Sequence, residues 1–166
     1  STVRTLRSIA NSAVTLLVLD ATQGIGDMEQ HIANLVEEEG NGIVIVVNKW
    51  DTVEDKDGNT IDRYTEYVRR KLIFLEYAPI IFVSAVTKKR LYSLYDLITA
   101  VYSNRHKHVP HKDLNDFMKR LSDRTQQPLL SSGKGRVHYL RQDKSVDYPK
   151  FLAFVNRVEV FKTPFT

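Results

Sequence analysis

The sequence of 166 residues contains no cysteine. Without cysteine the protein can form no disulfide scaffold, no cysteine nucleophile and no thiolate metal site. The longest apolar runs, at 13–19 and 42–47, are far shorter than the roughly 20 residues of a membrane-spanning helix, and the chain does not open with a basic-then-apolar signal peptide. We therefore expect a soluble protein of a reducing compartment, the cytoplasm, with no membrane among its partners.

Neither composition nor net charge is extreme, but the charge is unevenly distributed. Apolar residues make up 42%, charged residues 27% and aromatic residues 10%, which is typical of globular proteins. Residues 1–103 hold 11 basic and 14 acidic side chains, a net charge of −3, whereas residues 104–166 hold 13 basic and 6 acidic side chains, a net charge of +7. The asymmetry predicts two modules, placed at 1–107 and 108–166, and the second suits a polyanionic partner.

The first module alternates β-branched runs with helical patterns, which is typical of an α/β fold with a parallel sheet. Strands are expected at 13–19, 42–47 and 79–83. Their nearly continuous apolar character predicts a sheet that is covered on both faces. The helices expected between and after these strands lie at 27–40, 61–75 and 91–102.

Two details of these helices follow from side-chain spacing. Asp27 and Gln30 have the spacing of a capping box at the start of the first helix. The apolar stripe of the third helix is assigned to the core and comprises Leu91, Leu94, Tyr95, Ile98, Val101 and Tyr102. In the second module, a helix is expected at 113–125 and β-strands at 136–141 and 151–155.

The segment Asn48-Lys49-Trp50-Asp51 directly follows a buried strand, at the carboxyl edge where open α/β sheets bind ligands. A carboxylate at Asp51 can accept two hydrogen bonds, from N1–H and the exocyclic amine of guanine. The Asn48 amide can contact the opposite edge of the base, and the Lys49 stem can cover its ring. Trp50 is assigned to packing. The alternative is a turn in which Asn48 and Asp51 only begin and cap the next segment.

Ser84 and Ala85 follow the next strand, where a backbone N–H can reach the O6 atom of guanine. This dipeptide is a weak indication by itself. Together with 48–51 it gives the order strand, Asn-Lys-x-Asp, helix, strand, Ser-Ala, which chance rarely produces. The combination favours guanine binding over the simple turn-and-cap alternative.

These segments identify a family resemblance. The chain is similar to a translation-factor-related G domain, and most closely resembles the second G domain and following KH-like domain of the Der (EngA) tandem GTPases of ribosome assembly. The resemblance rests on Val-Arg-Thr-Leu at 3–6, Leu-Asp-Ala-Thr-Gln-Gly-Ile at 19–25, Val-Val-Asn-Lys-Trp-Asp at 46–51 and Ser-Ala at 84–85. It implies part of a Ras-like parallel sheet of the P-loop NTPase class with flanking helices, followed by a small, incomplete α/β KH-like domain.

The resemblance also implies ligands and partners. The guanine-binding residues it implies are Asn48, Lys49, Asp51, Ser84 and Ala85. The implied ligands are GTP and GDP, with Mg²⁺ in the intact protein. The implied partner of the basic module is ribosomal RNA of the large ribosomal subunit.

The chain departs from the family pattern in its phosphate-binding part. It has no G-x-x-x-x-G-K-[ST] motif, and Asp-Lys-Asp-Gly at 55–58 follows the base motif instead of preceding the first strand as a D-x-x-G switch segment would. We therefore expect the family pattern to begin before Ser1 and to continue after Thr166, and the segment alone not to hydrolyse GTP. The strand at 13–19 is then expected to have a bare edge, which favours aggregation unless it is covered.

Two other groups of residues have the spacing of metal sites. Asp55, Asp57, Asn59 and Glu66 match positions of a calcium loop, but Thr60 stands where that loop requires glycine. A solvated acidic loop is the favoured interpretation. The three histidines within 106–111 are flanked by cations that oppose a dication, so a solvated or phosphate-contacting basic linker is favoured there.

The turn near Lys134 and Arg136 and the following stretch with Arg141 combine glycine, cations and aromatic side chains. Such a surface suits phosphate contact and base stacking, so these three residues are the candidate nucleic-acid-binding residues. The alternative is an ordinary β-turn followed by a half-buried strand. The basic character of the whole module favours RNA contact.

Two hypotheses of different classes follow. In the first, the chain is the guanine-recognition part of a Der-like GTPase of ribosome biogenesis, and its basic module contacts RNA or the ribosome. In the second, it is a non-enzymatic RNA-binding module whose G-domain-like half is only a scaffold. A steep salt dependence of RNA binding with no nucleotide effect would favour the second.

Overall fold

The computed structural model describes residues 7–124, 137–146 and 148–156. Residue contacts divide the chain into two units, Ser1–Arg105 and His106–Thr166. The elements of the first unit are β1 (Val14–Asp20), α2 (Asp27–Glu38), β2 (Gly42–Asn48), η1 (Trp50–Thr52), α3 (Thr60–Lys71), η2 (Ile73–Leu75), β3 (Ile80–Phe82) and α4 (Leu91–Arg105). In the described part of the chain, no helix combines the length and apolar character needed to cross a membrane.

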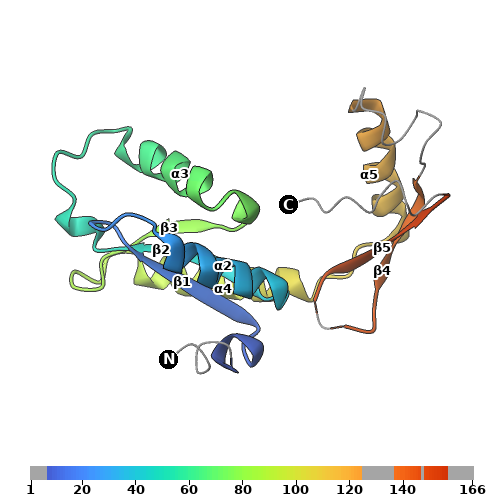
Figure 1. The fold of residues 1–166 in the computed structure, drawn as a ribbon, viewed down its shortest axis with the longest axis horizontal. Helices are drawn as coiled ribbons and strands as arrows, with labels where there is room; N and C mark the ends of the chain where they lie inside the picture. Colours follow the sequence, from blue (N-terminus) through green and yellow to red (C-terminus); the bar gives the residue numbers. More distant parts are fainter. Residues whose placement is uncertain (1–6, 125–136, 147, 157–166) are drawn as a thin grey trace. The chain divides into compact units, whose positions relative to one another are not determined.

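The first unit is built on a three-stranded parallel sheet in the order β1-β2-β3 (Figure 1). β1 and β2 pair along their whole lengths, from Val14 opposite Gly42 to Asp20 opposite Asn48. β3 pairs with the second half of β2, from Ile45 opposite Ile80 to Val47 opposite Phe82. The predicted strands and parallel sheet are confirmed, since β-branched runs joined by helices favour parallel pairing.

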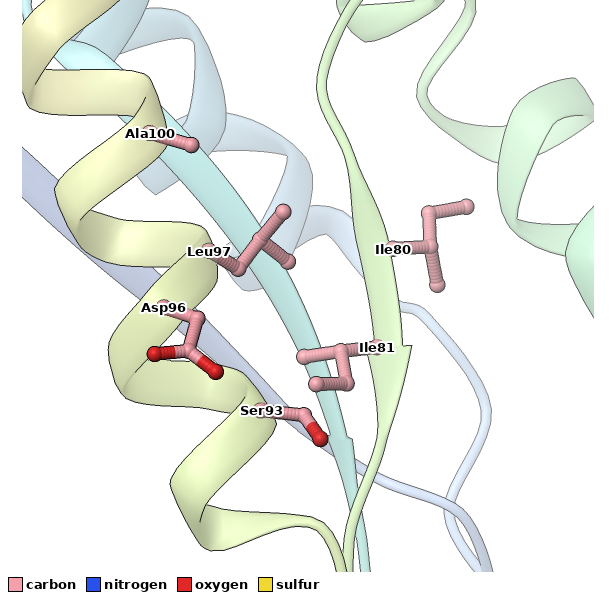
Figure 2. Close-up of a pocket in the computed structure, with 6 residues that line it drawn as sticks. All are labelled: Ile80, Ile81, Ser93, Asp96, Leu97 and Ala100. Carbon is pink, nitrogen blue, oxygen red and sulfur yellow. The ribbon is translucent and has the colours of Figure 1, made fainter.

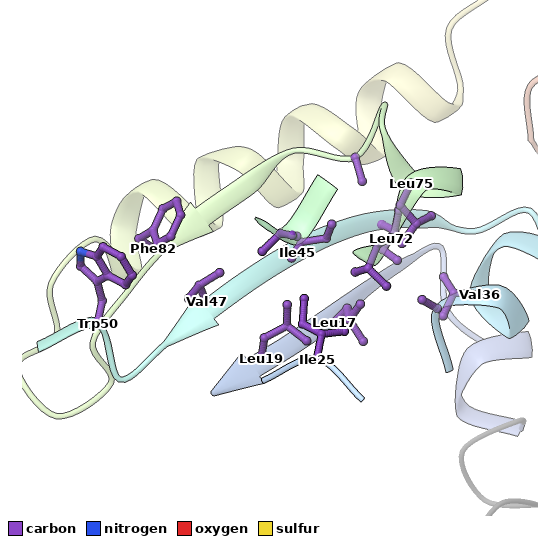
Figure 3. Packing of buried hydrophobic residues seen from close by; sticks show 14 of the residues in the cluster. Leu17, Leu19, Ile25, Val36, Ile45, Val47, Trp50, Leu72, Leu75 and Phe82 are labelled. Carbon is purple, nitrogen blue, oxygen red and sulfur yellow. The ribbon is translucent and has the colours of Figure 1, made fainter. Parts of the chain in front are cut away.

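One face of the sheet is closed by α2, α3 and η2. Ile43, Ile45 and Val47 project from β2 into a cluster of fully or almost fully buried side chains. Figure 3 shows Leu17 and Leu19 of β1 in the same cluster, with Trp50 and Phe82 at one end of it. Alternate residues of both strands therefore form the main core, as the two-residue period of a strand requires.

The other face is covered by α4, and only in part. Val44, Val46 and Val83 are buried there against side chains of α4. On β1, however, Leu16 is 38% exposed and Val18 57% exposed. The expectation that both faces are covered is thus correct for β2 and wrong for β1. Within the described residues β1 pairs only with β2, so its other edge has no partner there.

The core assignment of the α4 stripe is wrong for its tyrosines. Leu91, Leu94 and Val101 pack against the sheet, but Tyr95 is 72% exposed and Tyr102 is 51% exposed. Both tyrosines lie at the margin of the apolar face, where an aromatic ring with a polar tip tolerates water.

The capping pair of α2 lies one residue earlier in the sequence than predicted. The Glu29 carboxylate accepts a hydrogen bond of 2.9 Å from the Gly26 N–H, and Gly26 has the extended backbone of an N-cap residue. The pair is therefore Gly26 with Glu29, and not Asp27 with Gln30. Asp27 and Glu29 both lie in the first turn, where the positive end of the helix dipole stabilises carboxylates.

The second unit contains α5 (His111–Arg124) and the antiparallel strands β4 (Val137–Asp143) and β5 (Lys150–Val155). These elements agree with the helix and the two strands expected in this part of the sequence. Leu114 of α5 is buried, and Tyr139 stacks on Phe154 across the two strands at 4.2 Å between ring centroids. The Val-Arg-Thr-Leu segment at 3–6 and the turn that carries Lys134 and Arg136 lie outside the described residues.

Candidate functional site

The candidate residues lie where the parallel strands end. Past the ends of the strands, hydrogen bonds continue to join the loops: Ala21 N donates to the Asn48 carbonyl at 2.9 Å, and Trp50 N donates to the Val83 carbonyl at 3.1 Å. The loop after β2 is therefore held between the loops that follow β1 and β3. This is the edge at which open α/β sheets bind ligands.

Asn48 and Ala85 contact each other directly. The Ala85 N–H donates to Asn48 Oδ1 at 3.1 Å, so the amide of Asn48 is oriented by the loop after β3. With Oδ1 engaged, Nδ2 is the part of this side chain that can donate to a ligand. The sequence places both residues at one site, and the structure brings them into contact there.

Ser84 and Asp51 form a second contact across the same two loops. Ser84 is 2% exposed, and its Oγ accepts a hydrogen bond of 3.1 Å from the Thr87 N–H. A hydrogen bond from the Ser84 side chain lowers the pKa of the Asp51 carboxyl. Asp51 is solvent-exposed and therefore ionised at neutral pH, so the site presents a carboxylate acceptor to a ligand.

Lys49 lies between these residues and has an unusual backbone. Its φ is 59°, in the left-handed region that side chains other than glycine seldom adopt. Its Nζ pairs with Asp20 Oδ2 at 2.6 Å. Asp20 belongs to the Leu-Asp-Ala-Thr segment at the end of β1, and the sequence analysis assigned it no role in the site. An Asp at a strand end followed two residues later by Thr is the available sequence signal, since it is typical of an Asx turn.

Trp50 belongs to the core beneath the site. It is 8% exposed and its ring packs edge-on against Tyr64 and Phe82, at centroid distances of 5.5 and 4.5 Å. Lys56 Nζ donates to the Trp50 carbonyl at 2.5 Å. The assignment of Trp50 to packing is supported, and this anchor fixes the backbone beside Asp51.

The other candidate groups lie elsewhere. Arg141 is on β4 in the second unit and is exposed. Asp57 binds within its own loop and the helix that follows it, to Arg63 at 3.0 and 3.1 Å, as well as to Thr60 and Asn59. Within residues 7–124, 137–146 and 148–156, no cluster of three His, Cys, Asp or Glu side chains could hold a metal ion.

A pocket of about 430 Å³ lies beside β3 and α4 (Figure 2). Ile80 and Ile81 line it from the strand, and Ser93, Asp96, Leu97 and Ala100 line it from the helix. None of the residues at the carboxyl ends of the strands contributes to its lining. The pocket is thus distinct from the candidate site.

Comparison with known proteins identifies relatives of the chain. The family model "Elongation factor Tu GTP binding domain" matches residues 2–104. GTPase Der of Limosilactobacillus reuteri (strain DSM 20016) is 40% identical over 160 residues, which cover 96% of this chain and 36% of that protein. GTPase Der of Lacticaseibacillus casei (strain BL23) is 42% identical over 153 residues, covering 92% of this chain and 35% of that protein.

The chain thus spans about a third of the length of these relatives. Among solved structures, the crystal structure of a "probable GTP-binding protein engB" superposes with a TM-score of 0.51 at 16% identity, covering 63% of this chain and 66% of that one. At this identity the likeness concerns the fold alone. The match of the family model over most of the chain decides the membership: the chain belongs to the family of the elongation factor Tu GTP-binding domain.

Proposed function

We propose that this chain is the guanine-recognition part of a GTP-binding protein, a Der-like GTPase that acts in ribosome biogenesis during assembly of the large subunit. The observation that carries the proposal is the pair of side-chain contacts between the loops after β2 and β3. They present the exposed Asp51 carboxylate and the oriented Asn48 amide at one edge of the sheet. The similarity to GTPase Der over 96% of the chain supports it.

The polar groups at this edge fit guanine better than adenine. Asp51 accepts, and guanine offers two neighbouring donors, N1–H and the exocyclic amine. Asn48 donates through Nδ2, and guanine has the acceptors N7 and O6 on its other edge. Adenine lacks this pair of donors, because its N1 atom is an acceptor and its C2 atom carries no amine. It would therefore leave the Asp51 carboxylate unpaired, which costs binding energy.

The phosphates and the magnesium ion require other groups. Nucleotide triphosphates are held by a glycine-rich loop whose lysine contacts the phosphates and whose hydroxyl binds Mg²⁺. The sequence of 1–166 contains no such motif. We therefore assign base recognition to this chain, and neither GTP hydrolysis nor Mg²⁺ binding to its residues.

Replacing Asp51 tests the base contact. In the full-length protein that carries this chain, Asp51→Asn should weaken GDP and GTP binding by about 100-fold, because the amide places a donor opposite the guanine amine. The same variant should bind xanthosine diphosphate more tightly than wild type does, since xanthine has a carbonyl oxygen at that position. Competition binding with GDP, GTP, XDP and ATP measures both changes.

Asp55→Asn is the matched control, because it makes the same chemical change in the adjacent loop. It should leave all four affinities unchanged. Wild-type protein that does not prefer guanine over adenine nucleotides would contradict the proposal. An Asp51→Asn variant that retains full GDP affinity would remove the residue from the site.

For the second unit we propose contact with ribosomal RNA, and we assign residues 108–166 to a KH-like domain. The support is the net charge of +7 over 104–166 and the exposed Arg141 on β4. Lys134 and Arg136 are proposed to contact phosphates with it. The place of action proposed for the protein is the cytoplasm.

Salt dependence tests this RNA contact. Arg141→Gln should reduce the slope of log K against log salt concentration by about one and weaken binding to RNAs of different sequence alike, because a phosphate contact releases counterions without identifying bases. Arg63→Gln in the first unit is the control and should leave the slope unchanged. Equal slopes for wild type and Arg141→Gln would exclude Arg141 from the RNA surface.

A further inference from the structure

Asp20 is the one acidic side chain of the β1 strand, and both of its oxygens have specific partners. Oδ1 accepts from the Thr22 N–H at 2.9 Å and from the Thr22 hydroxyl at 2.7 Å. Oδ2 pairs with Lys49 Nζ at 2.6 Å. The Asp20 side chain is only 20% exposed. Thr22 therefore fixes the carboxylate, and the carboxylate in turn fixes the ammonium group of Lys49.

The backbone of Lys49 is held from the same direction. Asp20 is the register partner of Asn48, and the next residue, Ala21, donates its N–H to the Asn48 carbonyl at 2.9 Å. Lys49 itself lies in the left-handed region with φ of 59°, which needs support from its surroundings. The end of β1 thus restrains Lys49 through its neighbouring peptide and through its side chain.

The Lys49 side chain is 53% exposed although its ammonium group is paired. A lysine has large rotamer freedom in water, and a flexible stem covers a ligand poorly. When the ammonium group is anchored, the methylene groups form a fixed apolar surface between Asn48 and Asp51.

We propose that Asp20 is a positioning residue for guanine-nucleotide binding, which anchors Lys49 so that its methylene stem packs on the face of the base. This inference rests on the proposed function of the site. Asp20 itself acts through Lys49 and requires no contact with the nucleotide. The pairing also neutralises the lysine, so that Lys49 contributes apolar cover rather than a free positive charge. The Lys49 ammonium and Thr22 hold the pKa of Asp20 at about 2, so the anchor is ionised throughout the neutral range.

The test replaces the charge and keeps the shape. In the full-length protein, Asp20→Asn retains an oxygen that can accept from Thr22, but its amide cannot form an ion pair with Lys49. The dissociation constants for GDP and GTP should rise about tenfold, the change expected from losing one charge-assisted contact. The melting temperature without nucleotide should stay within about 3 °C of wild type, because the pair is partly exposed.

A double-mutant cycle separates positioning from a general structural role. Lys49→Met keeps an unbranched apolar stem without the ammonium group. In the Lys49→Met background, Asp20→Asn should have no further effect on GDP affinity, because the residue through which Asp20 acts is gone. An undiminished tenfold loss in that background would overturn the proposal.

Asp57→Asn is the matched control. Asp57 also forms an ion pair, with Arg63 at 3.0 Å, and its pKa is also about 2. Its partners, however, lie in its own loop and in α3. Its variant should bind GDP as wild type does. Wild-type protein that binds no guanine nucleotide would overturn both the proposed function and this inference. The inference alone would be overturned if wild type and Lys49→Met both bind GDP normally while the Asp20→Asn variant either keeps wild-type affinity or loses binding only because it is unfolded.

Discussion

Strands β1 and β2 lie side by side and have the same apolar, β-branched sequence character, yet only β2 is enclosed on both faces. Every residue of β2 from Ile43 to Val47 is buried, whereas on β1 only Leu17 and Leu19 are. Towards α2 and α3 the two strands are alike. The difference lies on the α4 face, where Val18 is 57% exposed and its register partner Val46 is 3% exposed.

The size of a helix explains this difference. Neighbouring strands are about 4.8 Å apart, and a helix with its side chains is about 10 Å wide. One helix therefore covers about two strands. α4 packs on Val44 and Val46 of β2 and on Ile81 and Val83 at β3, so β1 lies at the margin of its cover. An apolar run in a sequence thus indicates a strand without indicating how many faces are buried.

The largest effect expected from this comparison is a loss of stability when Val46 of β2 is replaced. Val46→Thr changes little in shape but buries a hydroxyl group, which should lower the free energy of unfolding by about 1–3 kcal/mol. Val18→Thr makes the identical change on the same face of the neighbouring strand. It should alter the free energy of unfolding by less than about 0.5 kcal/mol, because the side chain is mostly in water.

Urea unfolding of the two variants beside wild-type chain measures both values. Since the chemical change is the same, the ratio of the two effects depends on burial alone. Equal losses for Val18→Thr and Val46→Thr would show that β1 is as well covered as β2, and would contradict the comparison.

The comparison also shows what the sequence reveals about the fold. The three parallel strands and the helices between them were predictable, because β-branched runs and helical spacing are local signals. The exposure of Leu16, Val18 and Tyr95 was not, since it depends on where α4 lies across the sheet. The capping pair at Gly26 was missed for a different reason, because glycine has no side chain that marks an N-cap.

In the candidate site, too, some features were predictable from the sequence and others were not. The location of Asn48, Asp51 and Ser84 at one edge of the sheet was predictable from their place after buried strands. Their contacts across the two loops are consistent with that prediction, which the proposed nucleotide experiments test. The pairing of Asp20 with Lys49 was not predictable, because it requires a left-handed backbone at Lys49 and a carboxylate fixed by Thr22. Neither feature has a periodic signature in the sequence.

The smallest expected effect concerns the ion pair that joins the ends of β1 and β2. The pKa of Asp20 is about 2, against an ordinary value of 3.8. In the unfolded chain this carboxyl takes up a proton at higher pH than in the folded chain, so the stabilisation is complete above about pH 4 and is lost as the pH falls through about 2. Unfolding by urea at about pH 5, 4, 3 and 2 should therefore show a shallower acid loss for Asp20→Asn than for wild type.

Asp57→Asn provides a parallel measurement in a different part of the same unit. Its carboxyl also has a pKa of about 2, set chiefly by Arg63. The free energy of unfolding of its variant should therefore also fall slightly less steeply with decreasing pH than that of wild type. Because the two aspartates share no partner, the double variant should combine the two effects additively. Both effects should be smaller than that of Val46→Thr, since solvent screens exposed pairs. If the acid loss is as steep in Asp20→Asn as in wild type, Asp20 and Lys49 do not join the ends of β1 and β2 in solution.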